Sequence, residues 1–310
     1  MLDTSTLPRR ASIRDNPLLS ALLRIAKATD IKLCITDVIL EESTSARRRA
    51  AEQAISELKA AVRKLGSLHE ESGGDLYIPS VEEIVERWEG DLRSSFSILE
   101  TAGEDARLSL LREANRIPPA RASGDSAIGS RDASIWLTAK RAAGEQRVLL
   151  VSGNTSDFAG TNGLRQELEE ELSEGELVAY SASVDATVSL LAESVIPIAR
   201  DVSDVNAWDG DSDILMQATN FVIASTDETL DYAYGQIDNK SMEVRREYAF
   251  PGGRLALIAL TSDLKISPLD LDPSDAGSRN YPIIVDFWVL WDDDESTSID
   301  VDRIRHDSSG

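Results

Sequence analysis

Short apolar runs that alternate with stretches of helical periodicity constrain the fold of this chain most. The runs IKLCIT, RVLLVSG and LVAYSA are continuous, as in the buried strands of parallel sheets. Between them, apolar residues recur every three or four positions, most clearly over residues 37–65. The sequence therefore predicts a parallel α/β fold from residue 2 to about residue 199.

The pattern changes after about residue 200. The segment REYAFPGGRLALIALTS joins two β-rich runs through a Gly-Gly pair, which predicts a hairpin, and YPIIVDFWVLW follows as a further β-rich run. Residues 1–200 and 201–310 are therefore interpreted as two domains, the second a β-rich or α+β module. The last twenty residues, 291–310, are expected to fray.

The charge of the chain restricts its partners. The formal net charge is −23, yet residues 1–66 carry 12 Lys and Arg against 8 Asp and Glu. Phosphates repel an acidic protein, so nucleic-acid binding would need a local basic patch in this first part. The apolar runs are too short to span a membrane. The single cysteine, Cys34, is expected to be buried, and one cysteine fits a reducing cytoplasm.

The sequence lacks the residues that several kinds of catalytic site require. The two histidines, His69 and His306, read as solvated loop residues, and no Cys/His cluster could hold zinc. GDSAIG misses the nucleophile elbow pattern by one residue, and no phosphate-binding glycine loop is present. Carboxylates remain abundant, and carboxylates at strand ends suit hard cations such as Mg²⁺ or Mn²⁺.

Four acids stand where a predicted strand meets the following helix or loop: Asp3, Glu42, Asp132 and Asp157. If the strands are parallel, these side chains project near one edge of the sheet. Crowded carboxylates repel one another, so a divalent cation would compensate them. Two such ions about 4 Å apart would form a site for attack on a phosphodiester.

The segments MLDTSTL, ITDVILEES, GSRDASIW and VLLVSGNTSDF resemble, in this order, four motifs of the PIN-domain nucleases. The resemblance covers about residues 1–200 and implies a three-layer α/β fold with a five-stranded parallel sheet. It also implies a ribonuclease that depends on Mg²⁺ or Mn²⁺. The metal ligands and catalytic acids implied are Asp3, Glu42, Asp132 and Asp157, with Asn154 as a further ligand.

The chain departs from the common motif pattern of this family in three places. The first strand is nearly missing before Asp3, and a helical insertion of about 75 residues lies between Leu40 and Asn115. Asn154 stands where many members have an aspartate, so Asp157 is expected to serve at that position.

Substrate contacts are predicted on the basic side of the site. Arginine-rich positions near Glu42 suit RNA phosphates. The residues predicted to bind substrate are Arg9, Arg47, Arg48, Arg131 and Ser152. Trp136 and Phe158 are expected in the core, because their neighbours are apolar.

Two alternatives to a ribonuclease stay open. A magnesium-dependent phosphatase of the haloacid-dehalogenase kind also has an aspartate after its first strand, but it needs D-x-D-x-T and position 5 here is Ser5. A catalytically degenerate PIN fold would instead bind RNA or a protein. The acidic module 201–310 is expected to serve partner binding, autoinhibition or self-association.

Overall fold

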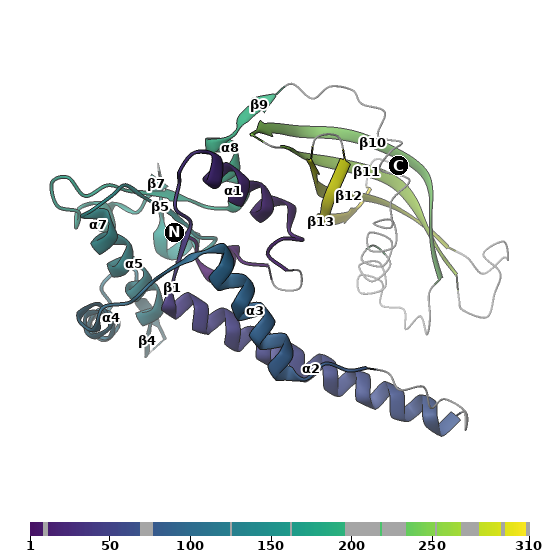
Figure 1. Ribbon diagram of the computed structural model, residues 1–310, viewed down its shortest axis with the longest axis horizontal. Coiled ribbons are helices and arrows are strands. Elements are labelled where there is room, and N and C mark those ends of the chain that lie inside the picture. Colours follow the sequence, from purple (N-terminus) through teal and green to yellow (C-terminus); the bar gives the residue numbers. More distant parts are fainter. Residues whose placement is uncertain are drawn as a thin grey trace. The chain divides into compact units, whose positions relative to one another are not determined.

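The described chain forms two compact units (Figure 1). The computed structural model describes residues 1–8, 12–68, 77–124, 126–161, 163–195, 218, 234–251, 253–267, 279–292 and 295–307. One unit comprises Met1–Ile13 and Thr29–Thr187, and the other Arg14–Ala28 and Val188–Gly310. The domain boundary predicted near residue 200 lies outside the described residues.

The first unit is built on parallel strands, as the continuous apolar runs predict. Strand β1 (Cys34–Thr36) pairs with β2 (Ser97–Leu99), and β5 (Val148–Val151) pairs with β8 (Val178–Ser181). Both pairs are parallel, and Ile35 of β1 and Leu150 of β5 are fully buried, whereas all three residues of β2 are half-buried. These pairs form the floor of the α/β unit.

Residues 1–3 join the two strand pairs. The amide of Leu2 donates to the Cys34 carbonyl at 2.9 Å, and the amide of Asp3 donates to the Val151 carbonyl at 2.9 Å. Leu2 also forms a parallel bridge with Val151. The expected five-stranded parallel sheet is not confirmed: the described residues form two parallel strand pairs with the single bridge residue Leu2 between them, and the first strand is reduced to that residue.

The helices of this unit follow the predicted periodicity. They are η1 (Thr4–Thr6), α2 (Asp37–Leu68), α3 (Val81–Ser95), α4 (Gly103–Asn115), α5 (Ser130–Ala143), α6 (Thr155–Phe158) and α7 (Gln166–Glu169), with α8 (Val184–Leu191) at its boundary. Two short hairpins, β3 (Arg121–Ser123) with β4 (Ser126–Ile128) and β6 (Ala159–Gly160) with β7 (Gly163–Leu164), connect them. Helix α3 packs along α2 in the predicted insertion (Figure 1).

The sequence also predicts helix over LRSSFSIL, LRQELEEELSEG and VDATVSLLAESVIPIA, and each of these three stretches is helical only in part. LRSSFSIL was expected to be helical, but α3 ends at Ser95 and β2 follows, because Ile98 is β-branched and pairs with Ile35. LRQELEEELSEG forms only the four residues of α7, since its many like charges destabilise a helix. Helix α8 ends at Leu191 rather than near Pro197.

The second unit is an antiparallel sheet. Its strands are β9 (Glu193–Val195), β10 (Tyr234–Phe250), β11 (Gly253–Ser267), β12 (Arg279–Asp292) and β13 (Glu295–His306), in the spatial order β13-β12-β11-β10-β9. The hairpin predicted at the Gly-Gly pair is confirmed, since Phe250 faces Gly253. The expectation that residues 291–310 fray is wrong for β13, which pairs along β12 with the apolar residues Ile299 and Val301 alternating within it. Residues 293–294 and 308–310 lie outside the described residues.

The core of the second unit uses both faces of this sheet. One face gathers Ile258, Val285 and Phe287, all without exposed surface. Leu255 and Trp288 are buried on the opposite face, because successive side chains alternate. Helix α1 (Pro17–Ala28) packs on β11, β12 and β13, so a helix from early in the chain completes this unit.

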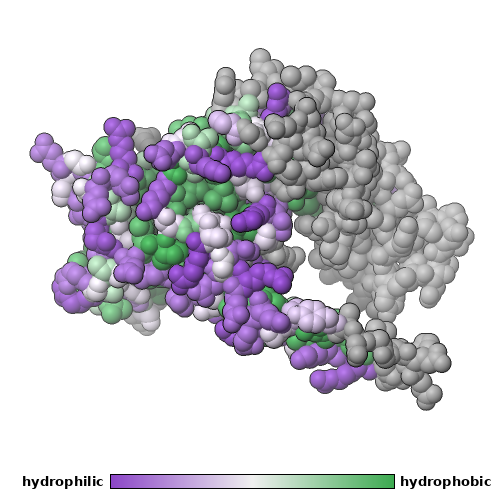
Figure 2. All heavy atoms as spheres, viewed as in Figure 1, coloured by the Kyte–Doolittle hydropathy of each residue, from purple (hydrophilic) through white to green (hydrophobic). Residues whose placement is uncertain are grey.

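None of the described helices could cross a membrane. No helix in the described ranges combines the length and apolar character that crossing a bilayer needs. Figure 2 shows hydrophilic side chains over most of the described surface on one face, with separate hydrophobic patches between them.

Candidate active site

Asp3 is held firmly although its strand is a single bridge residue. It caps η1, and its Oδ1 accepts a hydrogen bond from the Thr4 amide at 2.7 Å. Its Oδ2 accepts from the hydroxyls of Ser5 at 2.8 Å and Ser152 at 2.7 Å. The carboxylate is buried, and these three donors fix its position.

Ser152 occupies a place different from the predicted one. It follows β5, is fully buried and donates its hydroxyl to Asp3, so it orients an acid instead of facing substrate. Its own Oγ accepts from the Asn154 amide at 3.0 Å, and its carbonyl accepts from the Tyr180 hydroxyl at 2.6 Å. Burial raises the pKa of Tyr180, and the charge of Asp3 raises it further. Tyr180 therefore stays protonated beneath the loop that holds Asp3.

Asp157 and Asn154 share the position after β5. Asp157 is buried in the short helix α6, and the amide nitrogen Nδ2 of Asn154 donates to its Oδ2 at 2.8 Å. Arg121, which lies on β3, approaches the Oδ1 of Asp157 at 3.4 Å. The asparagine thus supports the neighbouring aspartate directly.

Asp132 lies in the first turn of α5, as the sequence predicts. Its residue is 6% exposed, and its Oδ1 is buried without a hydrogen bond among the described residues. Burial raises the pKa of this carboxyl; Arg131 opposes that rise, Asp3 and Asp157 add to it, and a hydrogen bond from Asn154 lowers the pKa. The charges of Asp3 and Asp157 are therefore close enough to Asp132 to raise its pKa.

Glu42 lies two turns into α2 and faces the same region. Its Oε2 accepts from the Thr4 hydroxyl at 2.5 Å, and its Oε1 is ion-paired with the guanidinium of Arg131. A second nitrogen of Arg131 lies 3.6 Å from the Oδ1 of Asp132. Arg131 therefore lies between two of the predicted ligands.

The donor set suits a hard cation, although its carboxylates are not gathered around one point. Within the described parts of the chain, no three Asp, Glu, His or Cys side chains lie close enough to hold one metal ion. Yet the oxygen ligands are of the kind that Mg²⁺ and Mn²⁺ prefer, and the buried Oδ1 of Asp132 accepts no hydrogen bond among the described residues, with Arg131 approaching it only to 3.6 Å. The residues that would hold an ion are Asp3, Glu42, Asp132 and Asp157. Glu42 would first have to leave Arg131.

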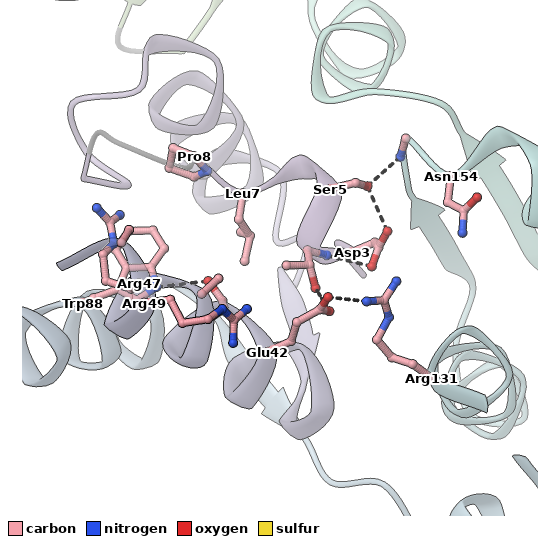
Figure 3. Close-up of a pocket in the computed structure, with 15 residues that line it drawn as sticks. Asp3, Ser5, Leu7, Pro8, Glu42, Arg47, Arg49, Trp88, Arg131 and Asn154 are labelled. Atoms are coloured by element: carbon pink, nitrogen blue, oxygen red, sulfur yellow. Dashed lines mark hydrogen bonds and ion pairs between the residues drawn. The ribbon is translucent and has the colours of Figure 1, made fainter. Parts of the chain in front are cut away.

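A cavity of about 550 Å³ opens beside these acids. Figure 3 shows Asp3, Arg131 and Asn154 at one end of it and Arg47 with Trp88 at the other, and Glu42 lies between. The guanidinium of Arg47 lies over the Trp88 ring, 4.1 Å from its centroid. The cavity therefore links the acids to part of the arginine run on α2.

The other predicted substrate residues are distributed unevenly. Arg131 and Arg47 line the cavity, whereas Arg48 is exposed and paired with Glu82 at 3.2 Å. Arg9 lies outside the described residues.

Thr4, Ser5 and Trp88 were not predicted as site residues. The two hydroxyls directly follow Asp3 in MLDTSTL, which is a usable signal for hydrogen bonds to a carboxylate. Trp88 gave no signal of this kind, because its approach to Arg47 depends on the packing of α3 against α2.

Buried side chains elsewhere in the unit confirm two expectations. Trp136 and Phe158 have no exposed surface, so both belong to the core. Cys34 is a buried free cysteine, and burial raises the pKa of its thiol, so it is not a reactive thiolate.

Comparisons with known proteins identify the family. No curated protein and no solved structure matches the chain significantly. The sequence model described as PIN domain matches residues 1–158, about half of the chain, including Asp3, Glu42, Asp132 and Asp157. The chain therefore belongs to the PIN-domain family.

Proposed function

We propose that this protein is a Mg²⁺- or Mn²⁺-dependent ribonuclease that hydrolyses phosphodiester bonds of single-stranded or structured RNA. This proposal rests on the carboxylate of Asp132. It is buried, its Oδ1 accepts no hydrogen bond among the described residues, and the charges of Asp3 and Asp157 raise its pKa. A structural carboxylate would have its oxygens satisfied, whereas a ligand keeps one available. PIN domains are generally nucleases, and this site lies within the matched residues.

Each residue has a definite part in this proposal. Bound divalent ions would activate water and stabilise the departing oxygen. Asp3 is oriented by Ser5 and Ser152, so its free electron pairs keep one direction. Arg131 is half exposed and can donate to a phosphate once it releases Glu42. Arg47 lines the same cavity and adds positive charge beside the acids.

The phosphatase alternative loses support from the geometry at position 5. That chemistry needs an acid two residues after the nucleophilic aspartate, but Ser5 donates its hydroxyl to Asp3 instead. A hydroxyl used in this way supplies no proton-transfer group of suitable pKa.

A binding-only PIN fold is the second candidate function. The ion pair between Arg131 and Glu42 favours it, because that pair occupies a predicted metal ligand. In this case the protein would hold RNA or a protein partner without cleaving RNA. The antiparallel second unit would provide a partner surface or self-association in either case.

The test is Mn²⁺-dependent cleavage of single-stranded RNA by the full chain and by Asp132→Asn. We expect a loss of at least about a hundredfold in the variant, because a ligand of the reacting ions is lost. Glu104→Gln is the matched control, since Glu104 is an exposed acid of the same unit paired with Arg107. Equal cleavage by wild type and Asp132→Asn would refute the assignment, and Mn²⁺ binding without cleavage would favour the binding-only fold.

A further inference from the structure

The cavity extends beyond what cleavage requires. Its acidic lining residues are Asp3, at the end that also holds Arg131 and Asn154, and Glu42, which lies between this end and Arg47. The part beyond Glu42 is lined by apolar groups and by arginine. These lining residues are Leu7, Pro8, Ala46, Ala50, Trp88 and the arginines 47 and 49. An apolar pocket with convergent cationic groups is a ligand site rather than a metal site.

The Arg47–Trp88 pair forms a rigid platform in this pocket. Trp88 is 4% exposed, and its indole nitrogen donates to the Ser43 hydroxyl at 3.0 Å, so its ring cannot rotate freely. The guanidinium of Arg47 covers one face of that ring at 4.1 Å. Burial lowers the pKa of Arg47, which indicates a guanidinium partly removed from water, although Asp91 opposes this effect. Cation–π contacts strengthen under such desolvation.

We propose that this platform binds the base of a single-stranded nucleotide adjacent to the phosphate held at the acids. The inference rests on the proposed ribonuclease function and names its substrate contact. Guanidinium planes stack on unpaired bases, and the Arg47 guanidinium that lies over Trp88 offers such a group in the wall of the cavity. Stacking is tolerant of base identity because every base has a π-face.

The spacing along α2 supports this assignment. Glu42 and Arg47 are five residues apart on one helix, an axial separation of about 7.5 Å. A neighbouring nucleotide can span that distance while its phosphate lies at the acids. Arg49 lines the same cavity and provides a charge for the phosphate backbone.

Charge distribution favours a nucleic acid over other occupants. The chain as a whole has a net charge of −23, so a polyanion is repelled from most of its surface. The arginine-lined part of this cavity lies in the basic first part of the sequence and is the exception. An uncharged apolar ligand would gain nothing from the arginines there.

The experiment uses uridine trinucleotides that carry 2-aminopurine at the first, second or third position. Stacking quenches 2-aminopurine fluorescence, so binding to the full chain in Ca²⁺ reports where a base is stacked. We expect strong quenching at one position above all. Arg47→Lys keeps the charge but removes the plane, so it should bind within about threefold of wild type and lose most of that quenching. Arg47→Ala should lose about fivefold or more in affinity.

Arg93→Ala is the matched control, because Arg93 lies on α3 like Trp88 but is exposed, is paired with Glu89 and does not line the cavity. It should quench like wild type. Binding without quenching at any position, or full quenching with Arg47→Lys, would overturn the stacking platform but not the proposed ribonuclease. Quenching without Mn²⁺-dependent cleavage would overturn the nuclease and leave the platform standing. No trinucleotide binding at all would refute the platform, and the cleavage assay would still decide the nuclease.

Discussion

At the scale of single residues, Arg131 and Asp132 have opposite effects on the site. Arg131 is ion-paired with Glu42 but approaches the Oδ1 of Asp132 only to 3.6 Å, so it neutralises the first carboxylate and compensates the second only in part. Asp132 is buried with an unsatisfied oxygen. The site is therefore held together by an internal cation while keeping one acid poorly compensated.

The first prediction concerns Arg131→Ala. A guanidinium and a metal ion compete for the same oxygen of Glu42, so removal of Arg131 should tighten Mn²⁺ binding by about two- to fivefold, the range of a partly exposed ion pair. Calorimetric titration of the full chain measures this change. Arg48→Ala removes an equal charge elsewhere on α2 and should change the affinity less than twofold. Weaker Mn²⁺ binding in Arg131→Ala would contradict the competition.

The second prediction concerns stability at Asp132. Burial raises the pKa of this carboxyl in the folded protein above its unfolded value, so the folded state binds the proton more tightly. The stability it contributes is present below the unfolded pKa and is lost as the pH rises through the raised folded pKa. Without added metal, Asp132→Asn should therefore raise the melting temperature at pH 7. Below the ordinary pKa of aspartate the two proteins should melt alike, and a lower melting temperature of the variant at pH 7 would refute this account.

Residue identities at the site were more predictable than their contacts. Asp3 and Asp132 stand out because each marks a boundary between a strand or loop and a helix. The role of Ser152 does not stand out in the sequence, since its burial depends on β5 lying beside residues 1–3. The pairing of Arg131 with Glu42 joins residues 89 positions apart, and local pattern says nothing of such contacts.

At the scale of elements, helix α3 has a capped N-terminus and also supplies a residue that lines the cavity. Ser80 caps this helix: its hydroxyl accepts from the Glu83 amide at 3.1 Å, and the Glu83 carboxylate accepts from the Ser80 amide at 2.7 Å. The sequence predicts this capping box from Ser80 and Glu83 alone. Because α3 carries Trp88, its N-terminus also supports one wall of the cavity.

The third prediction follows from this cap. Ser80→Ala should lower the free energy of unfolding by about 1 kcal/mol, the usual cost of losing a serine cap. Chemical denaturation followed by circular dichroism measures the loss. Ser94→Ala is the control, because its hydroxyl donates only to the Asp91 carbonyl within the last turn of α3, and it should cost less than about 0.5 kcal/mol. Equal losses in both variants would exclude a specific capping effect.

Strand β13 shows where element prediction failed. Its position at the end of the given sequence predicts fraying, but Ile299, Val301 and Ile304 pack against the sheet core. Arg305 also pairs with the buried Asp286 of β12. A charged edge strand is common, because charge on an edge discourages pairing with other chains.

At the scale of the whole molecule, the two units are not consecutive in the chain. Residues 14–28 belong to the second unit although residues 1–13 and 29–187 form the first. Helix α1 buries Leu19, Leu22 and Ile25, and it packs on strands that begin more than 200 residues later. Its periodicity predicts a helix, but no local pattern predicts which sheet it covers.

The fourth prediction concerns a fragment of residues 1–200. It lacks β10 to β13, so the apolar face of α1 loses its cover and should bind the dye ANS and promote aggregation. Size-exclusion chromatography and ANS fluorescence compare the fragment with the full chain. The double substitution Leu22→Gln and Ile25→Gln in the fragment should reduce both signals, because it removes the apolar surface of α1 alone.

The same double substitution should act in the opposite direction in the full chain. There Leu22 and Ile25 are buried in the second unit, so two glutamines would leave polar groups in an apolar core and lower its melting temperature. This reversal separates a role of α1 in the second unit from a general effect on solubility. A monomeric fragment that binds no ANS would show instead that residues 14–28 find their cover within the first 200 residues.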